Sequence, residues 1–105
     1  MAQTYHYLAA SERFLHEHIV EEVLEERRRD YLARNKPIDF WLVRAPAFLE
    51  ALGEHRCPLP AAAIVSTDGA FILWLKHRLQ YVLMGSFEAP SPAIPDPLAT
   101  SATVR

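Results

Sequence analysis

Two histidines on either side of one glutamate are the first residues in this sequence that could do chemistry. His16 and His18 flank Glu17, and imidazoles and carboxylates are common metal ligands. On a helix, however, residues two positions apart point about 200° away from each other, so the two rings would not converge on one ion. We therefore predict no metal site here.

The sequence has one cysteine, Cys57, and a histidine two residues before it, His55. A cysteine becomes a good nucleophile when a base lies beside it, which the sequence does not establish, and no second Cys/His pair could complete a zinc site. We interpret the stretch Gly53 to Pro60 as a surface loop. A single cysteine also excludes an intrachain disulfide and suits a reducing compartment such as cytosol or stroma.

Motifs for nucleotide cofactors and di-iron centres are absent from the sequence. The three glycines stand far apart, at positions 53, 69 and 85, so neither Gly-rich phosphate-binding pattern can occur. No glutamate is followed three residues later by histidine, as a carboxylate-bridged di-iron bundle would require. We therefore predict no catalytic residues, no bound cofactor and no enzymatic activity of the chain itself.

Two arginines interrupt helical faces that are otherwise apolar. Arg27 lies between Val23 and Tyr31 on a long predicted helix, and Arg78 shares a face with Leu75 on another. A buried guanidinium without a partner costs several kcal/mol. Each arginine must therefore extend to water, pair with an acid inside the protein or contact a partner protein, and the sequence leaves these alternatives open.

Asp39 stands directly before two large aromatic residues, Phe40 and Trp41, although aspartate is unfavourable inside a strand. One interpretation is a turn at the end of a strand, or an internal salt bridge with Arg27 or Arg78. The other is a protein-binding surface patch, because aromatic residues and arginine dominate protein interfaces. This patch would combine Asp39, Phe40, Trp41 and Arg78.

The run from Phe71 to Leu75 is apolar almost all the way round a helix, which is more than one face of a small sheet requires. Leu73 and Trp74 lie on opposite edges of the face formed by Phe71 and Leu75. We predict that both contact a partner, and a larger core is the alternative. With Arg27, they complete the predicted set of partner-binding residues.

The elements that would position these residues alternate between strands and helices. Hydrophobic periodicity, caps and turn residues predict strands over 3–9, 38–43, 61–65 and 81–87, helices over 12–34 and 68–79, and a short helix over 46–52. The order β-α-β-(short α)-β-α-β predicts an α/β fold of the α+β type, in which helices cover a four-stranded sheet.

Length and composition predict one domain and exclude some partners. The 105 residues fit a single domain over 1–89, and the prolines at 90, 92, 95 and 97 predict a mobile tail over 90–105 outside the core. The net charge of −2 gives no electrostatic reason to bind nucleic acid. The longest apolar runs are too short to cross a bilayer, and we expect neither a transmembrane helix nor a leader peptide.

Several segments, taken in order and spacing, are similar to the hypothetical chloroplast reading frame fifty-four family. The similarity runs from about Thr4 to Pro90. The segments that carry it are Thr4-Tyr5-His6-Tyr7, Ile38-Asp39-Phe40-Trp41-Leu42-Val43, Pro46-Ala47-Phe48-Leu49-Glu50, Ala62-Ala63-Ile64-Val65-Ser66-Thr67-Asp68 and Trp74-Leu75-Lys76-His77-Arg78-Leu79-Gln80-Tyr81-Val82-Leu83.

The resemblance implies both a fold and a role. It implies a sheet with largely antiparallel pairing. It also implies a non-catalytic accessory or assembly factor that binds and stabilises the di-iron subunit of the magnesium-protoporphyrin IX monomethyl ester oxidative cyclase, which forms protochlorophyllide in chlorophyll biosynthesis. Such a protein would be cytoplasmic in a cyanobacterium or stromal in a plastid, and peripheral to the thylakoid membrane through its partner. A homodimer would not exclude this role.

A protein that handles the tetrapyrrole directly is the alternative from another functional class. Such a carrier or enzyme would use His6, His16 or His77 as an axial ligand and the aromatic residues as a wall for stacking the porphyrin.

Overall fold

The computed structural model describes residues 2–18, 20–80 and 82–101, and the order of its elements agrees with the prediction. Ile19 and Tyr81, which were assigned to the long helix and the fourth strand, lie outside the described residues. The elements are β1 (Gln3–Ser11), α1 (Glu12–Glu17), α2 (Val20–Ala33), β2 (Phe40–Arg44), α3 (Ala47–Ala51), β3 (Ala61–Ser66), α4 (Gly69–Leu79) and β4 (Leu83–Ala89).

The helix expected over residues 12–34 is in fact two helices, α1 and α2, and this corrects the prediction. Ser11 begins α1 by accepting a 3.0 Å hydrogen bond from the Phe14 amide. His18 ends it: its ring stacks on Phe14 with the centroids 4.0 Å apart, and its Nδ1 lies 2.9 Å from the Phe14 carbonyl oxygen. The apolar spacing continues across this break, which is why the periodicity alone predicted one helix.

All four strands pair antiparallel in the order β2-β3-β1-β4, which confirms the predicted four-stranded sheet. In the register, Leu8 of the inner strand β1 lies between Ile64 of β3 and Met84 of β4. The strand β3, which is apolar from Ala61 to Val65 and ends at Ser66, is the other inner strand, and all of its residues are buried. The sheet therefore has two outer strands, β2 and β4.

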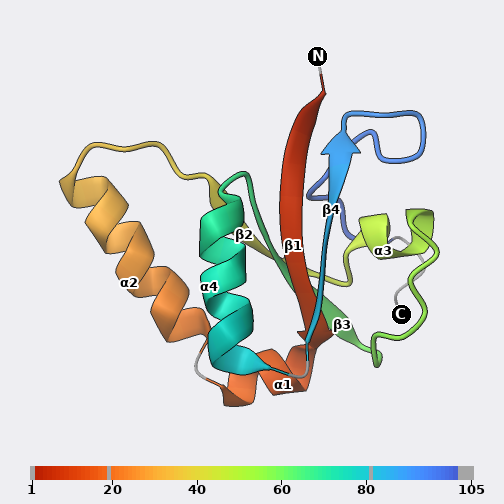
Figure 1. The fold of residues 1–105 in the computed structure, drawn as a ribbon, viewed down its shortest axis with the longest axis horizontal. Coiled ribbons are helices and arrows are strands. Elements are labelled where there is room, and N and C mark those ends of the chain that lie inside the picture. Colours follow the sequence, from red (N-terminus) through yellow and green to blue (C-terminus); the bar gives the residue numbers. More distant parts are fainter. Residues whose placement is uncertain (1, 19, 81, 102–105) are drawn as a thin grey trace.

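Each face of the sheet carries its own core. Figure 1 shows α1, α2 and α4 on one side of the sheet and α3 with the C-terminal segment on the other. Because side chains alternate along a strand, Leu8 and Ile64 pack in the core beneath α4, whereas Tyr7 and Val65 pack in the core beneath α3. This double cover explains why β3 and the buried half of β1, Tyr7 to Ala10, are rich in apolar residues.

The C-terminal segment takes part in the second core. Ile94 is 5% exposed and packs with Phe48 and Phe87, and Leu98 lies partly buried beside them. Backbone hydrogen bonds from Ala47 to Ala99 and from Ser101 to Ala45 fix the end of the described chain beside α3. The expectation that residues 90–105 contribute nothing to the core is therefore corrected for the described part of that range. The mobility of the segment stays a prediction.

Candidate interaction surface and the polar network beside it

Arg27 lies in a cage of aromatic rings between α2, β2 and α4. Its Cζ is 3.8 Å from the centroid of the Phe71 ring, 5.0 Å from that of Tyr31 and 5.4 Å from that of Phe40. The faces of these rings carry partial negative charge and attract the guanidinium. The arginine side chain is 24% exposed, so it reaches the edge of the core and not open solvent.

Arg27 pairs inside the protein. Its Nη2 donates hydrogen bonds to Tyr31 Oη (2.7 Å) and Asp68 Oδ2 (3.1 Å). Asp68 is also the cap of α4, because its Oδ1 accepts from the amides of Ala70 and Phe71. One carboxylate therefore holds both the start of α4 and the side of α2. Arg27 Nε is buried without a hydrogen-bond partner among the described residues.

Asp39 joins the same network through Tyr31. Tyr31 Oη donates a 2.9 Å hydrogen bond to Asp39 Oδ1, and the Asp39 carbonyl oxygen accepts from the Thr67 amide and the Ser66 hydroxyl. Asp39 therefore stands just before β2 and ties the α2–β2 connection to the end of β3. One of the two interpretations of Asp39 was a turn or a salt bridge inside the protein. In the structure Asp39 is connected to Arg27 through the Tyr31 hydroxyl and not by a direct salt bridge.

The four residues of the predicted patch do not form one surface. Phe40 is fully buried in the core beneath the helices, and Trp41, the next residue on the strand, packs on the opposite face of the sheet. Arg78 comes ten residues after Asp68, which is about 15 Å along α4 from the network that contains Asp39. The expectation that Phe40 is a surface residue is thus corrected, because the rings of Tyr31 of α2 and Phe71 of α4 pack against it.

The other predicted residues do gather on the outer side of α4. Trp74 and Leu73 are each 46% exposed, and Arg78 lies over the Trp74 ring with its Cζ 4.7 Å from the centroid. Trp74 in turn stacks on Phe71, at 6.2 Å between centroids, which connects this surface to the Arg27 cage. No carboxylate pairs with Arg78 in the described part of the chain. We call Leu73, Trp74 and Arg78 the α4 surface.

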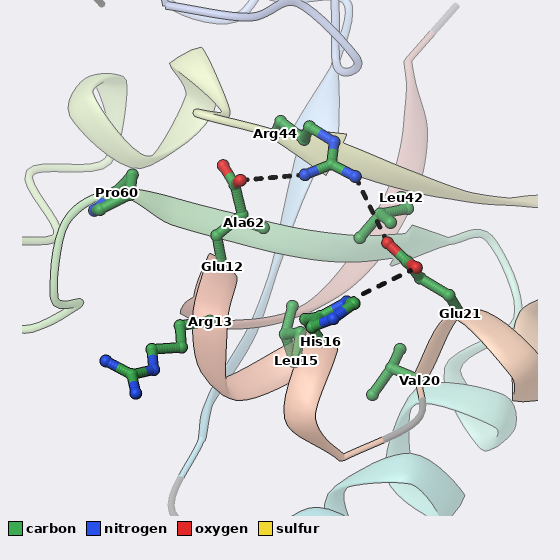
Figure 2. A pocket seen from close by; sticks show the side chains of 10 residues that line it. All are labelled: Glu12, Arg13, Leu15, His16, Val20, Glu21, Leu42, Arg44, Pro60 and Ala62. Atoms are coloured by element: carbon green, nitrogen blue, oxygen red, sulfur yellow. Dashed lines mark hydrogen bonds and ion pairs between the residues drawn. The ribbon is translucent and has the colours of Figure 1, made fainter.

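A cleft of about 330 Å³ lies between α1, α2 and the end of β2 (Figure 2). Figure 2 shows the Arg44 guanidinium between two carboxylates, with Nη1 2.9 Å from Glu12 Oε1 and Nη2 3.3 Å from Glu21 Oε2. His16 Nδ1 lies 3.8 Å from the other oxygen of Glu21. The charges in this cleft neutralise one another, so they do not favour a charged ligand.

A second cleft, of about 730 Å³, lies on the opposite side of the sheet beside α3 and the loop 53–60. Arg56 binds Glu54 there through two side-chain hydrogen bonds of 2.8 and 3.0 Å, and this lowers the pKa of Glu54 to about 2. Burial, with a smaller effect of Glu54, raises the pKa of the Cys57 thiol. A buried thiol with a raised pKa is poorly suited to nucleophilic chemistry.

Sequence reasoning missed two members of the polar network. Asp68 stands at the start of the helix predicted over 68–79 but was not recognised as the partner of Arg27, and Tyr31 was recognised only as an apolar position of α2. A tyrosine four residues after an arginine on one helix face was the available signal, since side chains at that spacing meet. The link to Asp68 spans 41 residues, so local spacing could not predict it.

No described helix is long and apolar enough to cross a membrane. Within residues 2–18, 20–80 and 82–101, no three His, Cys, Asp or Glu side chains lie close enough to hold a metal ion together.

The fold and its surface define a small α+β protein with an antiparallel four-stranded sheet, covered on both faces, and an exposed aromatic and arginine cluster on one helix. The family model described as "Ycf54 protein" matches residues 3–89. The chain therefore belongs to the Ycf54 family, which confirms the resemblance found in the sequence.

Relatives of known sequence occur in a cyanobacterium and a plant. A "Ycf54-like protein" of Synechocystis sp. is 59% identical over 102 residues, which cover 92% of this chain and 77% of that protein. The "Protein YCF54, chloroplastic" of Arabidopsis thaliana is 43% identical over 91 residues, which cover 83% of this chain and 43% of that protein. The family is thus found in cyanobacteria and chloroplasts.

Solved structures agree closely with this fold. The All0216 protein from Nostoc sp. superimposes with a TM-score of 0.92 at 56% identity, over 97% of this chain and 99% of that one. The Ycf54 protein from Synechocystis sp. superimposes with a TM-score of 0.89 at 54% identity, over 95% of this chain and 98% of that one.

Proposed function

We propose that this protein is a non-catalytic accessory factor that binds and stabilises the di-iron subunit of the magnesium-protoporphyrin IX monomethyl ester oxidative cyclase. Membership of the Ycf54 family supports the choice of partner, through the role that the resemblance implies. The protein would then act at the thylakoid membrane as a peripheral component, held there by the cyclase.

The observation that carries a binding role is the stack of Arg78 on Trp74. Both side chains are exposed on α4, and tryptophan and arginine are the residues that most often dominate the energy of protein interfaces. Leu73 widens the same surface with an exposed apolar side chain. An aromatic ring that is half exposed and already stacked by an arginine loses little conformational freedom when a partner covers it.

The polar network supports this role indirectly. Asp68 fixes the first turn of α4, Arg27 fixes Asp68, and Phe71 lies between Arg27 and Trp74. The α4 surface is therefore rigidly supported before it meets a partner, which reduces the entropic cost of binding. In this interpretation Arg27 and Asp39 position the surface from within, and Arg78 and Trp74 contact the partner.

The direct test measures binding of the purified cyclase di-iron subunit to this protein and its variants. Arg78→Ala and Trp74→Ala should each weaken binding at least about tenfold, as loss of an interface hot spot does. Arg29→Ala serves as the matched control, because Arg29 is an exposed arginine on α2, away from α4. Unchanged affinity in both α4 variants, with far-UV circular dichroism like that of the parent protein, would contradict the proposal, as would failure of the parent protein to bind.

A titration with magnesium-protoporphyrin monomethyl ester separates this role from that of a tetrapyrrole carrier. We expect no saturable spectral change at micromolar protein in the absence of the cyclase. A saturable change that is lost on replacing one of the histidines would favour the carrier.

A further inference from the structure

The outer strand β4 has backbone groups that point away from the sheet. Glu12 follows β1 and lies opposite Pro60 in the β1–β3 register, and its amide donates a hydrogen bond to the Pro60 carbonyl. Backbone groups on a strand point to alternate neighbours, so the even-numbered residues of β1 form their backbone hydrogen bonds with β3. The odd-numbered residues of β1 therefore bond to β4, where their partners are the odd-numbered residues from Leu83 to Ala89. The amides and carbonyls of Met84, Ser86 and Glu88 face outward and bond to no described backbone group.

This edge lacks the features that usually prevent strands from pairing between molecules. Such edges are commonly short or carry lysine, proline or a bulge. β4 is seven residues long, contains no proline, and has Glu88 as its one charged residue. The other outer strand, β2, is shorter and ends at Arg44, which is held by Glu12 and Glu21.

We propose that β4 pairs antiparallel with β4 of a second copy of this chain, so that two sheets join into one. Ser86 is the middle residue of Leu83–Ala89, and its amide and carbonyl point outward. A twofold axis at Ser86 therefore places every residue of the strand opposite a partner, and the three outward-facing residues of each copy form about six new backbone hydrogen bonds.

The side chains fit this register. Met84, which is 46% exposed, comes to lie opposite Glu88 of the partner subunit, so the two carboxylates do not face each other. Gly85 comes to lie opposite Phe87 of the partner subunit, and Leu83 opposite Ala89 of the partner subunit. Each bulky side chain on the α3 side of the sheet thus meets a small one. A twofold axis at Gly85 would instead place the two Gly85 residues opposite each other and would lose this match.

The pairing leaves the α4 surface free. Trp74 stacks on Phe71, which packs against Arg27 of α2, so the Trp74 edge of α4 faces α2 and not β4. A dimer formed through β4 would therefore present two copies of the α4 surface. The inference does not depend on the proposed cyclase partner, and its test uses the isolated protein.

The test measures mass in solution by sedimentation, with charges placed at the twofold axis. The parent protein should shift from its protomer mass of 12.0 kDa toward twice that value as concentration rises. Ser86→Lys and Ser86→Glu should each raise the dissociation constant at least about tenfold, because equal charges then meet across the axis. An equimolar mixture of the two variants should form dimers again, since only unlike charges meet in the mixed pair.

Controls and contrary outcomes complete the design. Ala33→Lys and Ala33→Glu make the same charge changes at an exposed position on α2 and should leave the dimer unchanged. Ser86→Pro removes the outward amide without adding charge and should also dissociate the dimer, while the β1 ladder is kept. A parent protein that stays at 12.0 kDa up to millimolar concentration would overturn the inference. So would a dimer that ignores the Ser86 charges, or variants that do not recover on mixing.

Discussion

Arg27 Nη2 lies 3.1 Å from Asp68 Oδ2, and this contact joins the middle of α2 to the first turn of α4. The carboxylate is at once a helix cap and the acceptor for a guanidinium that three aromatic rings surround. Neither helix needs the other for its own hydrogen bonds. The pair therefore adds a direct polar link between two helices that also pack in the same apolar core.

Loss of Arg27 should destabilise the protein, whereas loss of Arg78 should not. Arg27→Ala removes a partly buried ion pair and its aromatic contacts, and we expect the free energy of unfolding to fall by about 2 kcal/mol. Arg78→Ala removes only an exposed stack on Trp74, and the change should stay within about 0.5 kcal/mol. Urea unfolding with a common slope measures both. Equal destabilisation by the two changes would refute the distinction between a supporting and a contacting arginine.

Gly85→Ala should destabilise the sheet because Tyr7 lies across the glycine. A Cβ at position 85 would meet Tyr7 Oη at 2.7 Å and Cζ at 2.8 Å, and Tyr7 is only 6% exposed. The ring must move within a packed core, at a cost of about 1–3 kcal/mol.

Thermal unfolding in a double-variant cycle tests this cause. In a Tyr7→Leu background the ring is gone, so the added methyl group should cost clearly less. Tyr7→Phe should give no such relief, because it keeps the ring carbons that crowd the position. Additive effects in the Tyr7→Leu cycle would assign the cost to the backbone instead.

Acid should remove the contribution of Glu54 to stability. Its pKa falls from an ordinary 4.5 to about 2 because Arg56 donates hydrogen bonds to the carboxylate. A lowered pKa in the folded state means that the stabilisation is complete above about pH 4.5 and is lost as the pH falls toward 2. The difference in melting temperature between the parent protein and Glu54→Gln should therefore be largest near neutral pH and vanish near pH 2. Glu26→Gln, which makes the same chemical change at an exposed position on α2, is the control variant.

Cys57 should react slowly with thiol reagents while the protein is folded. The side chain is 7% exposed, and burial and Glu54 raise the pKa of its thiol above the ordinary 9.0. Labelling with Ellman's reagent at pH 8 should be slow in buffer and fast in denaturing urea. Rapid labelling of the native protein would show that the loop 53–60 opens readily.

The order of elements was predictable because each depends on local residues. The sequence indicated a strand over 61–65 and a helix over 68–79, and both are confirmed as β3 and α4. The packing of residues 90–101 was not predictable from composition, because prolines and small residues outnumber large apolar ones in this segment. Ile94 and Leu98 were the available signal, and they pack because α3 leaves the second face of the sheet partly open to them.

The candidate site was predictable only in part, for a physical reason. The exposure of Leu73 and Trp74 follows from a helix that is apolar nearly all round. The burial of Phe40 depends on Tyr31 of α2 and Phe71 of α4, whose rings pack against it from separate helices. Periodicity reports which side of an element is apolar, not which element covers it.

The strand β3 has a consequence for how this protein can change in evolution. Its six residues are all buried, and the five from Ala61 to Val65 belong alternately to the two cores. A substitution at one of these five therefore alters one core directly, while the backbone of the strand is shared with the other core. Three successive alanines, at 61, 62 and 63, are each at most 3% exposed, so a larger side chain at any of them would have to displace packed neighbours. Variation should therefore be tolerated least along this strand and most along the solvent side of α2, where an exchange touches neither core.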